Sequence, residues 1–294
     1  MDQPGDGPVV ARLRLGVLLR RAREAAGYTG EGAAEAIGGS ESKISRMEAG
    51  KVPSAESDVA DLLALYRVTD SAVLRSARAL ARESRQPPYW RSWSALMPPE
   101  VRHVLEVEAA ARSLVTYDPI AVPVMLQTAD YATAVAASSP FRPVRPWRGG
   151  LSPSMIARRQ ELLRSGLPRK HLWAVIDEAV LHRRSAGDTR VQREQIARLL
   201  AAADRGQRDV TVQIVPADSP HTLAAPGPFT IVVLPPDMPD AVILEHLTTL
   251  ELVTDQQSVD RYKELRDRIA MNALGPPASE ELLRRVVGAL RRGS

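Results

Sequence analysis

The stretch GSESKISRMEAGKVPS, residues 39–54, decides the fold of the first part of the chain. Within its predicted helix the strongly apolar residues are Ile44 and Met47, which are spaced to lie on one side. Burial of both side chains would turn the remaining residues outward as a row of polar groups. A short helix that is anchored at two points and polar elsewhere is typical of helices that enter the major groove of DNA.

The residues around this stretch predict a run of short helices. Thr29 and Ser40 are good N-caps, and glycines follow the second and third helices. Ala34 and Gly38 are small residues at a corner where two helices cross steeply, and such a crossing leaves little room for side chains. The predicted inner-face residues are Leu15, Leu18, Leu19, Ala22, Ala26, Ala33, Ala34, Ile37, Val59, Leu62, Leu63 and Tyr66. The four predicted helices cover residues 12–26, 30–37, 41–49 and about 54–66.

The spacing of these residues resembles that of the lambda-repressor-like (XRE) helix-turn-helix family. The likeness is carried by Leu15, Gly16, Leu19, Arg20, Arg23, Ala34, Gly38, Ser40, Lys43, Ile44, Ser45, Arg46, Glu48 and Gly50. It implies that Glu41, Ser42 and Arg46 approach base edges, and that Ser40, Lys43 and Lys51 approach phosphates. The predicted DNA-binding residues are therefore Ser40, Glu41, Ser42, Lys43, Ser45, Arg46 and Lys51. A polar residue, often Gln, usually follows the second helix's N-cap in this family, where the chain has Gly30.

Several of these residues have a second interpretation. Glu41 is suited to a base contact through a cytosine amino group, and equally to the first helical turn, where negative charge gains about 0.3–1 kcal/mol. Lys43 and Arg46 would, in the alternative, be solvated surface residues. We expect Glu48 to pair with a basic side chain of the first helix rather than with DNA.

Composition and charge limit the classes of protein to which the chain can belong. The chain has 294 residues, a net charge of +4 and no cysteine, which excludes disulfides and thiolate chemistry. Residues 1–11 are predicted to be a disordered N-terminus without the features of a secretory signal, and a cytoplasmic, nucleoid-associated protein with no membrane contact is expected. Between residues 12 and 51, eight basic residues against five acidic ones leave a charge of +3. A homodimer would double the phosphate contacts of this weakly basic domain.

The rest of the chain reads as a connector and a larger domain. The helix-turn-helix domain is assigned to residues 12–69, a helical connector and linker to 70–98, and an α+β domain with a mixed, partly antiparallel sheet to 99–294. Trp90 and Trp93 lie in the linker, where packing of the domains or a dimer interface is favoured over ligand stacking. Asp70 is expected to cap a connector helix over 71–83. Further helices are predicted over 100–114, 129–137, 154–165, 190–203, 258–274 and 279–290, and strands over 171–181, 209–216, 228–234 and 241–247.

The larger domain resembles the carboxy-terminal domain of actinobacterial helix-turn-helix regulators that are often called antitoxin-like. The matching phrases are VPxxLQTxxYA from Val122, RQxxL from Arg159, DEAxL from Asp177, VQxxP from Val212 and GxF from Gly227. The resemblance implies transcription regulation, often beside a gene for a small companion protein. The candidate ligand- or partner-binding residues of this domain are Gln127, Tyr131, Asp177 and Glu178.

Enzymatic chemistry has little support in the sequence. Asp177 and Glu178 on one strand would point to opposite faces, so they would not form an acid–base pair, and we expect structural roles or a partner contact. The five histidines lack metal-ligand spacing, so neither a metal nor a cofactor is expected. Residues 142–170 are basic and suit DNA, an acidic partner or an ordinary solvated surface.

The leading hypothesis is a dimeric, double-stranded-DNA-binding regulator whose larger domain senses a small molecule or a protein partner. An antitoxin-like protein that neutralises a companion and regulates its own gene is second, and an enzyme using Asp177, Glu178 and His182 is third.

Overall fold

In the computed structural model the chain forms two compact units. The first comprises Met1–Ala95 with Pro235–Pro239, and the second comprises Leu96–Leu234 with Asp240–Ser294. The structure describes residues 8–86, 104–105, 107–108, 110–138, 157, 160, 171–183, 188–204, 209–219, 227–246 and 250–292. A helical first unit and a mixed-sheet second unit confirm the predicted fold class.

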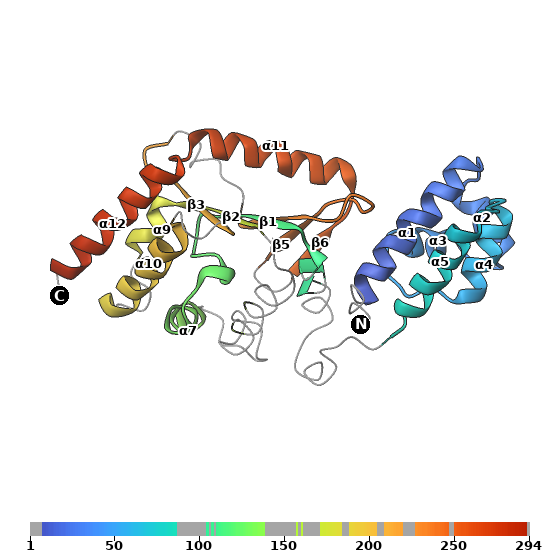
Figure 1. The fold of residues 1–294 in the computed structure, drawn as a ribbon, viewed down its shortest axis with the longest axis horizontal. Coiled ribbons are helices and arrows are strands. Elements are labelled where there is room, and N and C mark those ends of the chain that lie inside the picture. The colour runs from blue at the N-terminus through green and yellow to red at the C-terminus, as the bar shows by residue number, and fades with distance from the viewer. Residues whose placement is uncertain are drawn as a thin grey trace. The chain divides into compact units, whose positions relative to one another are not determined.

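The first unit is a bundle of short helices around one apolar core (Figure 1). Most residues at its centre are predicted inner-face residues, and Ala77 and Ala81 of the fifth helix, which were not predicted, complete the core. The buried core residues are Leu15, Leu19, Ala33, Ala34, Ile44, Met47, Val59, Leu62, Leu63, Tyr66, Ala77 and Ala81. The helices are α1 (Pro8–Ala25), α2 (Gly30–Ala36), α3 (Glu41–Glu48), α4 (Glu56–Leu65) and α5 (Ser71–Glu83).

Side-chain caps begin three of these helices, as predicted. The Thr29 hydroxyl accepts a hydrogen bond from the Gly32 N–H at 3.1 Å, and the Ser40 hydroxyl accepts one from the Lys43 N–H at 3.2 Å. The Asp70 carboxylate accepts one from the Ala72 N–H at 2.7 Å. Each cap satisfies a backbone donor that the first turn of a helix leaves unpaired.

The start of α1 differs from the prediction of a disordered segment over residues 1–11. The helix begins at Pro8, and Val10 and Ala11 are already buried. Proline suits the first turn of a helix because its missing N–H would have no partner there. Burial of Val10 and Ala11 then extends the helix beyond the residues whose periodicity was evident. Residues 1–7 lie outside the described part of the chain.

The second unit is built on a mixed six-stranded sheet in the order β3-β2-β1-β4-β5-β6 (Figure 1). Strands β1, β2 and β3 are parallel, whereas β4 pairs antiparallel with β1, β5 with β4, and β6 with β5. The strands are β1 (Ser113–Asp118), β2 (His171–Asp177), β3 (Val210–Val215), β4 (Phe229–Val233), β5 (Ala241–Glu245) and β6 (Leu250–Val253).

Helices cover both faces of this sheet. On one face, Val259 and Ile269 of α11 (Gln256–Asn272) pack in the same core cluster as Val115, Tyr117 and Phe229. On the other lie α10 (Thr189–Ala203) and α7 (Ala129–Ser138), as Figure 1 shows. Helix α12 (Pro276–Arg292) packs beside α10 and against β3. The remaining short elements are η2 (Val124–Leu126), a 3-10 turn, and α9 (Glu178–His182).

Three predictions for this unit were wrong. Residues 113–118 form the central strand β1 rather than the end of a helix and a loop, because burial of Leu114 to Tyr117 on both faces removes the alternation that marks a strand. Strand β6 was missed because it has only four residues, none of which is buried. The strand predicted over 171–181 ends at Asp177, and α9 begins at Glu178. Several other predictions fall outside the described residues: those for Trp90 and Trp93, for the loop 139–150 and for most of the helix 154–165.

The end of β1 gives the second unit a pH-dependent stability. The Asp118 carboxylate accepts hydrogen bonds from the Ile120 and Ala121 N–H groups at 2.8 and 2.9 Å, and removal from water raises the pKa of Asp118 to about 7. Because the folded pKa lies above the unfolded value, this group's contribution to stability is full below about pH 4 and is lost as the pH rises through about 7.

We therefore expect Asp118→Asn, which keeps the side-chain acceptor, to flatten the pH dependence of the free energy of unfolding between about pH 4 and 7. Urea unfolding followed by tryptophan fluorescence would report it, because Trp173 lies on β2. The variant should be more stable than the wild type above pH 7. Parallel pH profiles of the two proteins would contradict the assignment.

Candidate DNA-binding surface

Helix α3 is held to the core at two points, as the sequence predicts. Ile44 and Met47 are each 2% exposed. Gly38 has a φ of +58°, in the left-handed region that glycine favours. The N–H of the next residue, Gly39, donates to the Ala34 carbonyl at 2.9 Å and closes the turn between α2 and α3. The exposed residues that follow from this anchoring are Ser40, Glu41, Ser42, Ser45, Arg46 and Lys51.

An ion pair fixes the far end of α3 against α1. The Arg23 Nε and Nη2 atoms donate to the two Glu48 carboxylate oxygens at 2.6 and 2.9 Å, and Nη1 donates to the Tyr28 carbonyl at 2.9 Å. The two side chains are only 16% and 11% exposed. The hydrogen bonds to Glu48 raise the pKa of Arg23. This confirms the prediction that Glu48 pairs with a basic residue of the first helix.

Helices α1 and α3 also touch through their backbones. A Cβ atom added at Gly16 would lie 2.3 Å from the Glu48 carbonyl oxygen and 2.8 Å from the Met47 carbonyl oxygen. A glycine in mid-helix costs about 1 kcal/mol relative to alanine, so its presence here is explained by the approach of the two helices. Gly16 and the Arg23–Glu48 pair therefore set the position of α3 from the same side.

Gly30 occupies the position where lambda-repressor-like proteins usually have a polar residue. In the structure, the side chain of Glu41 lies over this position. A Cβ atom at Gly30 would lie 3.3 Å from the Glu41 Cγ atom, so the stem of Glu41 runs over this glycine. The carboxylate at the start of α3 thus lies beside the start of α2. The arrangement accommodates both interpretations of Glu41, since the same residue lies in the favourable first turn and on the exposed side of α3.

The basic residues of α3 differ in how they are held. Lys43 is half-buried and its Nζ atom lies 2.8 Å from the Asp58 carboxylate of α4. Arg46 is exposed, and its Nε atom donates to the Ser42 carbonyl at 3.2 Å. Lys51 is exposed just beyond the helix, where its N–H donates to the Arg46 carbonyl at 2.9 Å. Arg46 and Lys51 are therefore the basic groups of this region with the greatest freedom to contact DNA.

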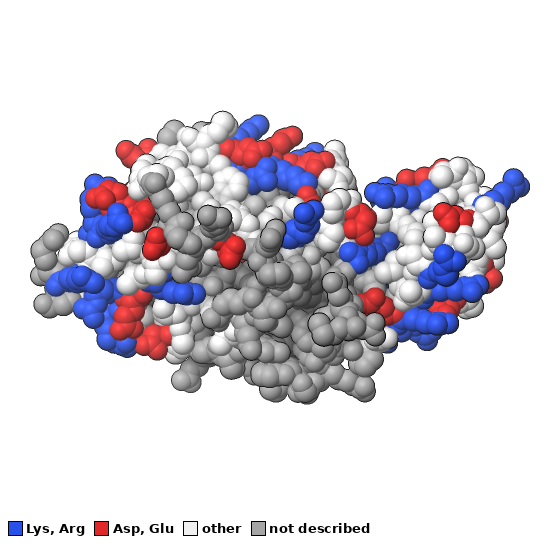
Figure 2. Space-filling model, in the orientation of Figure 1, with Lys and Arg blue, Asp and Glu red and all other residues white. Residues whose placement is uncertain are grey.

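On one face of the helical unit, charges are mixed rather than gathered in one patch. On the face seen in Figure 2, blue and red side chains are interspersed over this unit. Such a distribution produces weak long-range attraction to a polyanion, so short-range contacts have to supply most of the discrimination.

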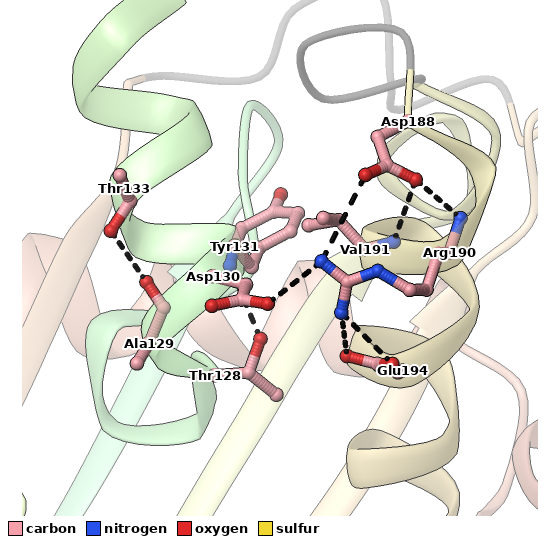
Figure 3. Close-up of polar contacts among 9 residues, drawn as sticks. All are labelled: Thr128, Ala129, Asp130, Tyr131, Thr133, Asp188, Arg190, Val191 and Glu194. Carbon is pink, nitrogen blue, oxygen red and sulfur yellow. Dashed lines mark hydrogen bonds and ion pairs between the residues drawn. The ribbon is translucent and has the colours of Figure 1, made fainter.

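In the second unit, Gln127 and Tyr131 hold a turn of the backbone. Gln127 is 7% exposed and its Nε2 atom donates to the Val122 carbonyl at 2.7 Å, while the Val122 N–H donates to the Tyr131 hydroxyl at 3.2 Å. Gln195 of α10 accepts from the Thr128 N–H at 2.7 Å. Beside this turn, Arg190 of α10 joins Asp130 of α7 at 3.0 Å (Figure 3). These contacts favour a structural role for Gln127 and Tyr131 over ligand binding.

Asp177 and Glu178 separate, as expected, but on either side of a strand end. Asp177 is buried at the last position of β2 and accepts a hydrogen bond from the Tyr117 hydroxyl at 3.2 Å. Desolvation raises the pKa of Asp177. Glu178 begins α9, accepts from the Ala217 N–H at 3.0 Å, and lies 3.7 Å from His182. Asp177 thus serves the interior of the sheet, and Glu178 faces a different part of the surface.

Comparison with known families gives two matches along the chain. Residues 14–85 match a helix-turn-helix domain model, and residues 101–285 match a domain of unknown function, DUF5753. The second match covers more than half of the 294 residues. The chain belongs to the DUF5753 family. No curated protein and no solved structure matches it. The helix-turn-helix match indicates DNA binding and transcription regulation.

The DUF5753 domain has a cleft that the sequence did not reveal. Helices α9, α10 and α12 surround a cavity of about 470 Å³, lined in part by Glu178 and His182. Of the residues predicted to bind a ligand or partner, only Glu178 lines it. The other lining residues come from segments about a hundred positions apart, so no local motif could have indicated the cleft.

The part of the chain that the structure describes has neither a metal-binding cluster nor a membrane-spanning helix. Within it, no group of three or more His, Cys, Asp or Glu residues is placed to hold a metal ion. In the same residues, no helix has the length and apolar character needed to cross a membrane.

Proposed function

We propose that this DUF5753-family protein is a sequence-specific DNA-binding transcription regulator that reads the major groove with α3. The observation that carries the proposal is the burial of Ile44 and Met47, which leaves Glu41, Ser42 and Arg46 exposed on one helix. In this account these three side chains approach base edges, Ser45 faces the groove, and Ser40, Lys43 and Lys51 approach phosphates. Lys43 would exchange its contact with Asp58 for a phosphate contact, or be shared between them.

The protein acts as a homodimer in this proposal, and its DUF5753 domain senses a small molecule or a protein partner. Support for the dimer comes from electrostatics: a net charge of +3 over residues 12–51 provides few phosphate contacts for one domain, and two copies double them. Helix-turn-helix dimers place their half-sites about one turn of DNA apart. The kinship with the lambda-repressor-like group belongs to the same proposal and rests on residue spacing.

Arg46→Ala and Lys51→Ala test whether Arg46 contacts bases and Lys51 contacts phosphates. We expect Arg46→Ala to weaken binding to a preferred duplex by about 1–3 kcal/mol and to relax preference at one base position, because arginine reads guanine through two hydrogen bonds. Lys51→Ala should weaken all duplexes alike and flatten the salt dependence of affinity. Fluorescence anisotropy over a salt series, with the preferred duplex and a scrambled one, measures both. Equal losses on both duplexes for both variants would contradict the assignment.

Neutralisation of a small companion protein, with DNA binding used for autoregulation, stays an alternative that rests on the antitoxin-like sequence phrases. The two proposals differ in what accompanies the protein. Stoichiometric co-purification with a small protein, and loss of that protein's toxicity on co-expression, would favour the alternative. Co-expression without any change in growth or recovery would count against it.

A further inference from the structure

The cleft of the second unit has the size and lining of a small-molecule site. Its volume of about 470 Å³ falls within the range of about 300–1,000 Å³ that is usual for such sites. Apolar side chains from two sides of it come from α9 and α12, among them Leu181, Leu282, Val286 and Leu290. Leu181 and Leu282 are 1% and 8% exposed, so the apolar floor is part of the packed interior.

Gln192, a residue that lines the same cleft, carries a buried acceptor without a partner. Gln192 of α10 is 1% exposed, and its Nε2 atom donates to the Leu181 carbonyl at 2.9 Å and to the Val180 carbonyl at 3.4 Å. Both carbonyl groups need a donor, so the amide cannot rotate to exchange its nitrogen and oxygen. The Oε1 atom consequently has no hydrogen-bond partner among the described residues. Leaving a buried acceptor unpaired costs about 1–3 kcal/mol, which a ligand with a donor group would recover.

The rim of the cleft carries opposite charges. Glu178 is half-buried and already accepts a hydrogen bond from the Ala217 N–H, and His182 stands beside it. Arg285 of α12 is exposed, with no ion pair among the residues described. A carboxylate and a guanidinium at one opening favour neither a cation nor an anion strongly, so the polar part of a ligand is best served if it is uncharged.

We propose that this cleft binds an uncharged small molecule with an apolar body and one hydrogen-bond donor, which the Gln192 Oε1 atom accepts. The apolar body lies against α12, and the donor points toward α10. Under the proposed function, this cleft is the place where the DUF5753 domain senses its ligand. Only this consequence of binding rests on the proposed function. Binding itself is independent of DNA.

A fluorescent probe of this chemistry tests the site in the full chain. N-phenyl-1-naphthylamine is uncharged, apolar and carries one N–H donor, and 8-anilinonaphthalene-1-sulfonate is the same skeleton with a negative charge. We expect saturable binding of the uncharged probe, at least about tenfold tighter than that of the sulfonate. Ala289→Phe, which adds a ring at an exposed position lining the cleft, should weaken the uncharged probe at least about tenfold. Ala197→Phe, at an exposed position of α10 that does not line it, is the matched control and should leave binding unchanged.

Gln192→Met removes the Oε1 acceptor and keeps an apolar side chain of similar length. It also removes the Nε2 bonds to the Leu181 and Val180 carbonyls, so circular dichroism first checks that the variant folds as the wild type does. Loss of one neutral hydrogen bond predicts a weakening of about three- to tenfold. No saturable binding, binding unaffected by Ala289→Phe, or equal binding of the charged and uncharged probes would overturn the proposal. The assays contain no DNA, so a negative result would not contradict the proposed role of α3. A failure to bind DNA would likewise not contradict ligand binding in the cleft.

Discussion

Replacing Gly16 by alanine is expected to open the helical unit and displace α3. The new methyl group would lie 2.3 Å from the Glu48 carbonyl oxygen, a backbone atom that cannot turn aside as a side chain can. Relief therefore requires separation of α1 from α3 along the contact that also carries the Arg23–Glu48 pair. Overpacking of this kind costs about 1–3 kcal/mol and sometimes more, and we expect about 3 here because backbone meets backbone.

Amide hydrogen exchange of peptides from α1 to α4, measured in the full chain, reports the free energy of opening of this unit alone. Gly32→Ala is the matched control, because its methyl group would meet only ordinary contacts, the nearest at 3.4 Å to the Thr29 hydroxyl oxygen. Since alanine favours helix over glycine, this control should gain up to about 1 kcal/mol. A Gly16→Ala protein as stable as the Gly32→Ala protein would show that α1 and α3 do not meet as described.

Truncating Glu48 to alanine should have the second-largest effect. It leaves the Arg23 guanidinium, whose side chain is 16% exposed, with its hydrogen bond to the Tyr28 carbonyl and a longer contact, at 3.8 Å, with the exposed Glu24 carboxylate. Removing one partner from a buried pair typically costs about 3–5 kcal/mol. We expect roughly 2–3 kcal/mol at this site, because water reaches part of the pair.

The same helix supplies a control for the Glu48 prediction. Arg20 and Glu24 form an ion pair at 2.9 Å whose side chains are 66% and 53% exposed, and Glu24 also lies 3.8 Å from Arg23. Because water screens such exposed charges, Glu24→Ala should destabilise the unit far less than Glu48→Ala. Glu48→Gln, which retains one acceptor, should fall between the two. Hydrogen exchange of α1 and α3 peptides again provides the measurement. Equal stability of the Glu48→Ala and Glu24→Ala proteins would mean that the buried pair does not hold α3.

The fold of the first unit was accessible from sequence because each of its elements has a local signal. Thr29, Ser40 and Asp70 mark helix starts, and the apolar positions around Ile44 recur with helical spacing. The need for Gly16 was visible only as a resemblance, since its cause is the Glu48 carbonyl, which is distant in sequence. Likewise, the ion pair of Lys43 with Asp58 depends on how α3 and α4 pack.

The second unit was predicted less well for a physical reason. A strand such as β1, buried on both faces between β2 and β4, lacks the alternation of polar and apolar residues that identifies a strand with one solvated face. Its cleft joins Glu178 to residues of α12 that come about a hundred positions later. Gln127, which the sequence phrase placed among the candidate binding residues, is buried in the structure, and its amide donates to the Val122 carbonyl within a turn.

The central claim is that the exposed residues of α3 read bases, and selection from a library of randomised duplexes tests it most directly. The full chain and its Arg46→Ala variant would be compared at the same low salt concentration. Our account predicts that the wild type enriches a defined sequence, with two half-sites about 10–10.5 base pairs apart, and that the variant loses preference at one position of each half-site. No enriched sequence from the wild type, or the same sequence with undiminished preference from the variant, would contradict it.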